Sequence, residues 1–421
     1  MSTKLQDQLY QIGANAKKAS TILNTASSSQ KNQFFNFAIS EIKADTGAIL
    51  NANKADVEAA KENKKDAAFI DRLELTHERI DGICQTLEEI KLFDDPVGRV
   101  LSKWDRPNGL NISRVATPLG VIGLIFESRP NVASDAGGLC IKSGNAVILR
   151  SGKDGLKSAT ALVKSLQKAL IKADLPKKSI QIVPSESREA AILMLEGLNG
   201  TIDVIVPRGG KSLVAEVERS AKVPVFGHLE GVCHMYVDKD ADQDKALIIC
   251  VNAKMRRTGI CGAVETILVH EKIAPLFVPE IISNLVQLGC EVRCCPKTQA
   301  LDTQALPASE EDWSTEYLAP IVSIKAVCNI DEAIDHIEKY GTGHTESIIS
   351  ENKDAQSQFT QSIDSAIVMI NTSTQFADGG EFGLGGEIGI ATGKFHARGP
   401  VGVDQLTSFK YIVSSDGQIR D

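Results

Sequence analysis

Residues 120–151 read G-V-I-G-L-I-F-E-S-R-P-N-V-A-S-D-A-G-G-L-C-I-K-S-G-N-A-V-I-L-R-S, and this stretch decides the fold. It contains two short apolar runs, Val121–Phe126 and Ala146–Leu149, separated by a window of helical length. Each run is too short and too continuously apolar for a half-exposed antiparallel strand, so we expect both in a parallel sheet that is buried on its two faces. The stretch therefore predicts a β-α-β unit of an α/β protein.

The same alternation of strands and helices continues in two series, one from Gly120 to about Val237 and one from Glu265 to Ile370. A chain of 421 residues is too long for one ordinary core, so each series is expected to form its own α/β domain. The further expected strands are Ile180–Val183, Val204–Val206, Val223–Phe226, Glu265–Val269, Ile321–Val327, Glu346–Ile349 and Ala366–Ile370.

Other elements lie outside both series. Residues 2 to about 95 predict helices, because apolar residues recur three and four positions apart. The next segment alternates around the turn R-P-N-G and predicts a β-hairpin over about 99–117, and Phe409–Val413 predicts a terminal strand. Strands without a place in either sheet suggest a contact between subunits, so we expect a homo-oligomer.

Composition excludes several classes of function. The chain is 43% hydrophobic and 24% charged, with a net charge of −8 and no basic run. This argues against nucleic-acid or membrane-surface binding, while a local cationic site for a small anion remains compatible with it. The N-terminus has no secretory segment, no stretch resembles a membrane helix, and the cysteines number nine, an odd count. We therefore expect a cytoplasmic location and reduced thiols.

The segment M-R-R-T-G-I-C-G-A-V-E-T-I-L-V, residues 255–269, contains the candidate nucleophile, Cys261. The thiol follows an expected helix and precedes an expected strand, so it lies in a loop at a sheet edge, where catalytic residues concentrate. Arg256 and Arg257 favour the thiolate and suit an anionic substrate group, and the flanking glycines leave the backbone N–H accessible to an oxyanion. A loop cysteine without a catalytic role is the alternative at this point.

Two junctions of the first series are candidate phosphate-binding loops. V-I-V-P-R-G-G-K-S, residues 204–212, brings a strand into a Gly-Gly turn and a helix, whose first N–H groups suit a phosphate or pyrophosphate. In A-V-I-L-R-S-G-K-D, Arg150 and Lys153 follow a strand at the sheet edge where open α/β sheets bind ligands, and they suit an extra phosphate on a cofactor ribose. An ordinary turn and a solvated loop are the alternatives.

A third junction, F-E-S-R-P-N at residues 126–131, offers Arg129 or Asn131 as a donor to a reacting oxygen. No metal site is expected, because Cys290, Cys294 and Cys295 lack paired C-x-x-C spacing and no histidine follows at zinc-finger distance. The histidines form no catalytic group in the sequence, although His344 and His396 lie beside glycine-rich turns and are candidates to line a site.

Long ordered motifs carry a family resemblance over essentially the whole chain. V-C-N-I-D-E-A-I-D-H-I-E-K-Y-G-T-G-H-T-E-S-I (327–348), F-A-D-G-G-E-F-G-L-G-G-E-I-G (376–389) and H-A-R-G-P-V-G (396–402) resemble the γ-glutamyl phosphate reductases, a family within the aldehyde dehydrogenase superfamily. G-V-I-G-L-I-F-E-S-R-P-N and K-S-G-N-A-V-I-L-R do so too. The resemblance implies an aldehyde dehydrogenase-like α/β fold, with two Rossmann-like domains and a small β oligomerisation arm.

The implied activity is reduction of L-glutamate 5-phosphate to L-glutamate 5-semialdehyde and phosphate by NADPH, through a cysteine thioester. This reaction is the second step of proline biosynthesis from glutamate. The implied cofactor is NADP, and the implied partners are the small acyl-phosphate substrate and, as a candidate, the upstream glutamate kinase.

The resemblance also implies domain and residue roles. The cofactor-binding domain is expected at 1–98 and 118–230, the catalytic domain at 231–390, and the arm at 99–117 and 391–421. Cys261 is the expected nucleophile, and Asn131 is our choice of oxyanion donor. Expected cofactor contacts are Arg150, Ser151, Lys153, Arg208, Gly209, Gly210 and Glu316, and candidate substrate contacts are Arg257, His344, Thr345 and Arg398.

One departure from the superfamily is informative. Hydrolytic aldehyde dehydrogenases carry a general-base Glu in E-L-G-G-K, whereas this chain has H-L-E-G-V at 228–232, with His228 at the base position and Glu230 placed differently. A base that activates water would hydrolyse the thioester, so loss of that Glu agrees with a phosphate-releasing reductase. A hydrolytic aldehyde dehydrogenase and a non-catalytic binding protein are the alternatives.

Overall fold

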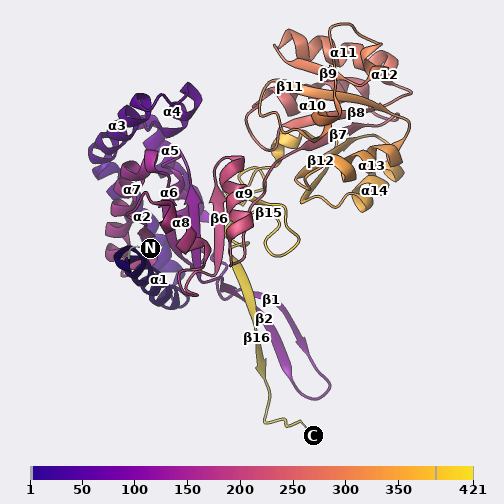
Figure 1. The fold of residues 1–421 in the computed structure, drawn as a ribbon. Helices are drawn as coiled ribbons and strands as arrows, with labels where there is room; N and C mark the ends of the chain where they lie inside the picture. Colours follow the sequence, from indigo (N-terminus) through magenta and orange to yellow (C-terminus); the bar gives the residue numbers. More distant parts are fainter. Residues whose placement is uncertain (1–2, 385, 421) are drawn as a thin grey trace. The chain divides into compact units, whose positions relative to one another are not determined.

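The structure, a computed structural model, describes residues 3–384 and 386–420. Its contacts divide the chain into two compact units (Figure 1). Unit 1 comprises Met1–Gly227, Gly383–Ile390 and Pro400–Asp421, and unit 2 comprises His228–Phe382 and Ala391–Gly399. Each unit contains a parallel sheet, so the expected α/β class with two Rossmann-like sheets is confirmed.

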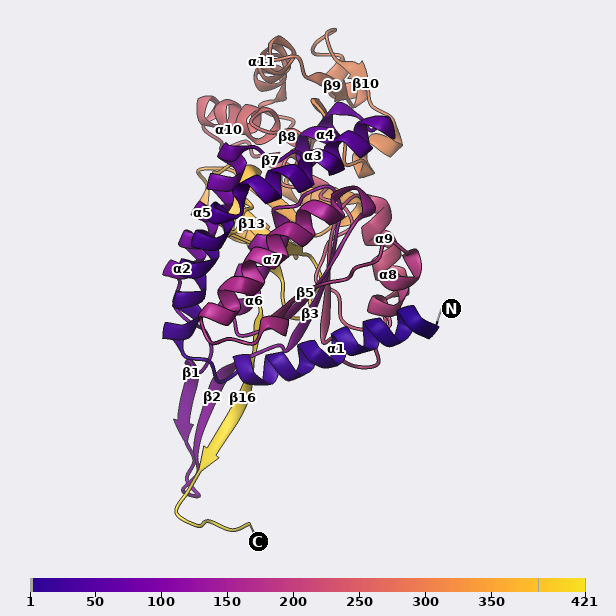
Figure 2. The ribbon, with the colours of Figure 1, turned by 90° about the vertical axis from the view of Figure 1, so that its left-hand side faces the viewer.

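Unit 1 is built on a parallel sheet with the strand order β5-β4-β3-β6. The central strand β3 is buried at every residue, as its uninterrupted apolar run requires. Helices α6 and α7 pack on this sheet, and α2 lies beside α7 (Figure 2). The sheet and its helices are β3 (Val121–Phe126), α6 (Val132–Lys142), β4 (Ala146–Ser151), η1 (Lys153–Gly155), α7 (Leu156–Lys172), η2 (Lys177–Ser179), β5 (Ile180–Ile182), α8 (Arg188–Leu195), β6 (Val204–Arg208) and α9 (Lys211–Ser220).

The N-terminal part of unit 1 is helical, as predicted. Leu9, Ala16 and Leu23 recur seven apart and are fully buried on one face of α1. A capping box at Ser27 and Gln30 fixes the start of α2. These helices are α1 (Thr3–Leu23), α2 (Ser28–Ala44), α3 (Thr46–Glu62), α4 (Ala67–Leu73) and α5 (His77–Leu92).

A three-stranded antiparallel sheet, called the arm here, extends from unit 1 (Figure 1). It consists of β1 (Val100–Asp105), β2 (Asn111–Pro118) and β16 (Thr407–Ser414), with β2 in the middle. The predicted hairpin and terminal strand therefore meet in one sheet apart from the two parallel sheets. Apolar side chains on β16 are exposed, with Tyr411 57% and Val413 55% accessible.

Unit 2 contains a larger parallel sheet with the order β10-β9-β11-β8-β7-β12-β13. Its central core lies between the sheet and helices α10 and α11, where Phe277, Ile267 and Val264 are fully buried. The elements are β7 (Cys233–Val237), α10 (Gln243–Met255), β8 (Val264–His270), α11 (Ala274–Gln287), β9 (Glu291–Cys294), α12 (Pro296–Gln299), β10 (Leu306–Pro307), η3 (Glu310–Ser314), β11 (Ile321–Val327), α13 (Ile330–Tyr340), β12 (Thr345–Ile349), α14 (Lys353–Ser362), β13 (Ile367–Ile370) and η4 (Thr374–Phe376). Two short strands, β14 (Ile390–Ala391) and β15 (Gly399–Pro400), pair with each other where the chain passes between the units.

The prediction of a strand at Val223–Phe226 is wrong. Only Val225 forms a β-bridge, to Ile205 of β6, because Pro224 has no N–H with which to continue the ladder. Strands β7 and β9 were not predicted. His234 interrupts the apolar pattern of β7 although it is fully buried, because the carboxylate of Glu346 on β12 accepts hydrogen bonds from its backbone and its ring.

The observed division of the chain differs in detail from the predicted domains. The main boundary lies at Gly227–His228, three residues before the predicted one. Residues 383–390 belong to unit 1 and residues 391–399 to unit 2, whereas the sequence placed them in the catalytic domain and the arm. The chain recrosses between the units there through the β14–β15 pair, which is too short to give a sequence pattern. No helix within residues 3–384 and 386–420 is long and apolar enough to cross a membrane.

Candidate active site

The candidate nucleophile lies at one edge of the unit 2 sheet. Strands β11, β8, β7 and β12 are neighbours and run parallel, so the segments that precede them meet at their amino ends. Glu316 precedes β11, Cys261 precedes β8, His228 precedes β7, and His344 directly precedes β12. The sheet therefore gathers four chemically competent side chains from segments that are far apart in sequence.

Three of these side chains form a compact cluster, called the thiol–histidine cluster here. One potential ligand atom from each of His228, Cys261 and His344 lies within 4.8 Å of the other two. The two imidazole rings pack edge to face, with centroids 4.7 Å apart. The sequence did not reveal this group, because without β7 nothing placed His228 at the same edge as Cys261.

His344 is the buried member of the cluster. Its Nδ1 lies 2.9 Å from Oγ1 of Thr345 and 3.7 Å from Sγ of Cys233, while its Nε2 is buried with no hydrogen-bond partner among the described residues. Burial and the neighbouring His228 lower the pKa of His344 to about 3. The ring is therefore neutral at pH 7 and carries a lone pair on one nitrogen. Thr345, a predicted substrate contact, is itself fully buried.

The loop that carries Cys261 is packed on several sides. Gly231 lies against it so closely that a Cβ there would overlap the carbonyl oxygen of Cys261 and approach its Cβ to 2.9 Å. The N–H of Gly231 donates to Oε1 of Glu316 at 3.0 Å. The thiol of Cys233 donates to the Cys261 carbonyl at 3.0 Å. These contacts fix the backbone and leave the Cys261 side chain partly exposed.

Cys261 differs from the other cysteines in its surroundings. All nine lie in the described part of the chain as thiols, and apart from Cys261 and Cys328 they are buried. Burial raises the pKa of several of them, Cys233 and Cys250 among them. Cys328 is exposed, but hydrogen bonds to Glu332 and Glu271 raise its pKa as well. Cys261 alone combines access with a histidine-rich environment.

A buried ion pair joins the two ends of the Cys261 loop. Lys254, at the end of α10, contacts Glu265 on β8, and both side chains are fully buried. Burial raises the pKa of Glu265 to about 7, against the opposing effect of the Lys254 charge. Gln375 adds a second link, since its amide donates to the carbonyls of Ala253 at 2.9 Å and Arg257 at 3.1 Å.

The predicted substrate arginines, Arg257 and Arg398, differ in their surroundings. The side chain of Arg257 is exposed on the loop that precedes Cys261. Arg398 is held by Asp364, whose carboxylate and carbonyl accept hydrogen bonds of 2.7 and 2.6 Å from the guanidinium. An arginine with this partner has less capacity for a substrate carboxylate.

The predicted cofactor residues of unit 1 gather at the carboxyl ends of its strands. Phe126 of β3 is in register with Ser151 of β4 and with Arg208 of β6, so the three strands end together. Arg150 has its Nε buried without a hydrogen-bond partner in the described part of the chain, and its Nη2 makes only long contacts of 3.5 Å to two carbonyls. Lys153 follows with an exposed side chain.

The Gly-Gly turn lies at the same edge. A Cβ at Gly209 would come within 2.7 Å of Oε2 of Glu127, whereas the space at Gly210 is open. The N–H of Gly210 donates to the Glu127 carboxylate at 3.4 Å, and Gly210, the N-cap residue of α9, has no side chain of its own to cap the helix. This edge thus offers a cationic group in Arg150, an acceptor in Glu127 and a helix that starts at a glycine.

Asn131 also lies in unit 1, just before α6. Its amide donates to Asp135 at 2.9 Å, and burial raises the pKa of Asp135 to about 6. Both residues line a small cavity of about 50 Å³ with Arg129 and Arg208. Sequence reasoning did not identify Asp135, because nothing in the local pattern distinguishes a buried helical Asp from an exposed one.

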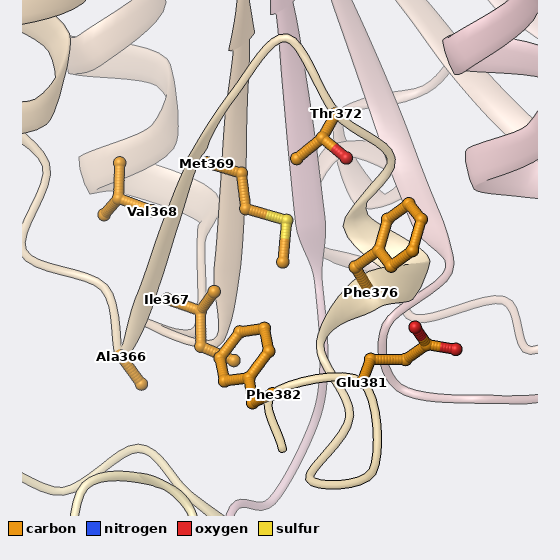
Figure 3. A pocket seen from close by; sticks show the side chains of 8 residues that line it. All are labelled: Ala366, Ile367, Val368, Met369, Thr372, Phe376, Glu381 and Phe382. Carbon is orange, nitrogen blue, oxygen red and sulfur yellow. The ribbon is translucent and has the colours of Figure 1, made fainter.

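A cavity lined by apolar side chains lies apart from the candidate nucleophile. It has a volume of about 490 Å³, lies on unit 2 along the edge strand β13, and includes no cysteine or histidine in its lining (Figure 3). Met369, Phe376 and Phe382 give it an apolar character. Cys290, Cys294 and Cys295, the cluster noted in the sequence, are buried at and beside β9.

Comparisons with known proteins identify the family of the chain. The model of the aldehyde dehydrogenase family matches residues 6–300 and 303–412. The γ-glutamyl phosphate reductase of Brucella suis biovar 1 is 54% identical over 420 residues, which cover 100% of both chains. That of Parvibaculum lavamentivorans is 53% identical and covers 98% of this chain and 97% of its own. The crystal structure of γ-glutamyl phosphate reductase from Thermotoga maritima, 42% identical, matches with a TM-score of 0.96 over 98% of this chain and 100% of its own.

Proposed function

The chain belongs to the aldehyde dehydrogenase family and, within it, to the γ-glutamyl phosphate reductases, and from this premise we propose that it reduces L-glutamate 5-phosphate to L-glutamate 5-semialdehyde with release of phosphate. In the structure, the observation that carries the proposal is the partly exposed thiol of Cys261 beside His228 and His344. A nicotinamide cofactor is a property of this family. NADPH, rather than NADH, is the finer proposal.

In the proposed mechanism, the Cys261 thiolate attacks the acyl carbon of the substrate. The backbone N–H of Cys261 and the amide of Asn131 stabilise the oxyanion, and the C–O bond to phosphate then breaks while Arg257 assists the departing anion. When bound, the cofactor supplies the hydride that brings the thioester carbon to the aldehyde level. The C–S bond breaks last, which releases the aldehyde and restores the thiolate.

His228 sits where a hydrolytic enzyme would need a carboxylate base. Its imidazole lies in the cluster with Cys261, so we propose that it accepts the thiol proton and does not activate water. This assignment supports release of phosphate over hydrolysis. Hydrolysis of the Cys261 thioester by water is therefore the reaction that must be measured to test it.

The residues of unit 1 fit a dinucleotide. Arg150, with its unpartnered Nε, and Lys153 suit the phosphate that distinguishes NADPH from NADH. The turn Arg208–Gly210 and the first N–H groups of α9, which starts at the glycine Gly210, suit the pyrophosphate. Ser151 follows Arg150 at the end of β4, and we propose the Glu127 carboxylate at the same edge as an acceptor for ribose hydroxyl groups. As the family resemblance implies, we propose Glu316 for the nicotinamide ribose.

His344, Thr345 and Arg398 stay as proposed substrate contacts. His344 and Thr345 are fully buried. We therefore expect them to affect substrate binding through the shape and polarity of the binding site. The arm is proposed as the contact of a homo-oligomer, because its strand β16 exposes Tyr411 and Val413 along an unpaired edge. An association with the upstream kinase is proposed on family grounds alone.

The reverse reaction tests the assignment. With glutamate 5-semialdehyde and NADP⁺, NADPH should form only when phosphate or arsenate is added, because the thioester needs that acceptor. If water alone supports the same rate, the chain is a hydrolytic aldehyde dehydrogenase and the proposal fails. Cys261→Ala should abolish nearly all turnover while NADPH binding remains, and the matched variant Cys328→Ser should stay active. Turnover of Cys261→Ala within about tenfold of the parent would exclude the covalent mechanism.

A further inference from the structure

The thiol–histidine cluster has the composition of a metal site. It offers one sulfur and two imidazole nitrogens, the donor set that binds Zn²⁺ and related transition-metal ions, and among the described residues it includes no carboxylate of the kind that Mg²⁺ or Ca²⁺ prefers. We propose that His228, Cys261 and His344 bind one Zn²⁺-class ion per chain and that this ion reversibly blocks the nucleophile.

The geometry is close to what such an ion needs. Zn–S bonds of about 2.3 Å and Zn–N bonds of about 2.0–2.1 Å place tetrahedral ligands roughly 3.5 Å from one another. The potential ligand atoms here lie within 4.8 Å, so the side chains must close by about 1 Å, which rotation about the half-buried His228 and Cys261 side chains can supply. Three protein ligands leave a fourth position for water, as in open zinc sites.

A second observation points to a ligand at this place. Nε2 of His344 is buried and has no hydrogen-bond partner among the described residues, which is costly for a polar atom unless something binds it. The opposite nitrogen, Nδ1, lies 2.9 Å from Oγ1 of Thr345. Histidine ligands in metal sites commonly donate their second nitrogen to a carboxylate, a backbone carbonyl or water, which orients the ring. The Thr345 hydroxyl can accept from Nδ1 in the same way and leave the lone pair of Nε2 for the ion.

Backbone support for the three ligands is already present. The segments carrying them precede the adjacent parallel strands β8, β7 and β12, so the sheet holds their Cα positions. The Cys261 backbone is further held by the contact with Gly231 and by the thiol of Cys233. The backbone of the three ligand segments can therefore keep its place when the ion binds.

Cobalt titration of the reduced, metal-free full chain tests the site directly. Co²⁺ replaces Zn²⁺ in tetrahedral sites and gives a thiolate-to-metal charge-transfer band that reports sulfur coordination. We expect saturation at one equivalent and displacement of the band by Zn²⁺. Cys261→Ser should lose the band, and His228→Ala and His344→Ala should each weaken binding at least about tenfold. The matched variants Cys328→Ser and His77→Ala, both on exposed residues, should bind as the parent does.

Persistence of the band in Cys261→Ser, or binding unaffected by either histidine variant, would overturn the proposal. His344 is buried, so its variant must be checked for folding by circular dichroism. A measurement on the unaltered chain does not depend on the folding of a variant. One equivalent of Zn²⁺ should protect Cys261 from alkylation by iodoacetamide, as mapped by peptide mass. Absence of protection rejects the site.

The inhibitory consequence rests on the proposed function, whereas binding does not. Zn²⁺ should abolish reductase activity at the same occupancy at which it protects Cys261, and a chelator should restore it. If the chain binds cobalt as expected but reduces no acyl phosphate, the metal site stands and the proposed function fails. If the chain reduces acyl phosphate but forms no cobalt band, the proposed function stands and the metal site is rejected.

Discussion

Oε1 of Glu316 accepts a hydrogen bond of 3.0 Å from the backbone N–H of Gly231, and Gly231 in turn packs directly against the Cys261 backbone. A residue that the family resemblance assigns to the cofactor therefore also supports the nucleophile loop. The two roles can be separated by substitution, because a glutamine keeps the accepting oxygen while removing the charge.

Glu316→Ala should lower kcat about tenfold or more, since a hydrogen bond to a charged acceptor contributes about 1.5–3 kcal/mol. Glu316→Gln should keep the rate of Cys261 alkylation close to that of the parent and should mainly raise the KM for the cofactor. Steady-state kinetics and timed alkylation measure both effects. Equal alkylation rates for the parent and Glu316→Ala would show that the contact with Gly231 does not position the thiol.

Gly231→Ala should lower kcat more than about tenfold, because the new methyl group meets the Cys261 carbonyl, which is backbone and cannot rotate away. Cofactor binding, measured by NADPH fluorescence, should be retained. Gly82→Ala is the matched control, since Gly82 lies in α5 with open space around it and alanine is favoured in a helix. A fully active Gly231→Ala would contradict the close packing described here.

Arg150→Ala should raise the KM for NADPH about tenfold or more and leave the KM for NADH nearly unchanged, because the lost contact is to the extra phosphate. Lys164→Ala removes an exposed charge from α7 and should change neither constant. Parallel kinetics with both cofactors make the comparison. An equal rise for NADH and NADPH would assign Arg150 to a phosphate that the two cofactors share.

Lys254→Met should lower the free energy of unfolding by about 3–5 kcal/mol, because it leaves the fully buried carboxylate of Glu265 without its partner. The double variant Lys254→Met/Glu265→Leu should recover much of this loss, since no buried charge remains. Lys245→Ala, which breaks an exposed pair with Glu351, should cost less than about 1 kcal/mol. Urea denaturation measures the free energy of unfolding of all three variants. A small effect of Lys254→Met would show that the ion pair does not stabilise the Cys261 loop.

His336→Gln should reduce the loss of stability in acid. Burial, with nearby His234 and Lys325, lowers the pKa of His336 to about 2 from an ordinary 6.5. Below pH 6.5 the unfolded chain takes up a proton at this histidine and the folded chain does not. The free energy of unfolding therefore falls by about 1.4 kcal/mol for each pH unit below 6.5. Urea midpoints at several pH values between 7.5 and 5 should therefore depend less on pH in the variant. His77→Gln, on an exposed residue, should leave the slope unchanged, and an unchanged slope in His336→Gln would refute burial as the cause.

Much of the fold follows from local sequence pattern. β3 and β11 begin and end where their apolar runs do, and the hairpin around R-P-N-G forms as predicted. These elements can be predicted because the pattern that specifies each of them lies within its own residues. β7 was missed because its buried His234 is satisfied by Glu346, more than a hundred residues away, and no local pattern reveals such a partner. The strand expected at 223–226 failed because of a single proline.

The sequence by itself determined which thiol to suspect, which loops follow the strands of unit 1, and which family the motifs resemble. Tertiary structure alone decided what surrounds Cys261. His228, Gly231, Glu316 and His344 reach its edge of the sheet because parallel strands bring their amino ends together whatever their order in the chain. The chemistry of a thiol depends on such through-space neighbours, and spacing along the chain does not encode them.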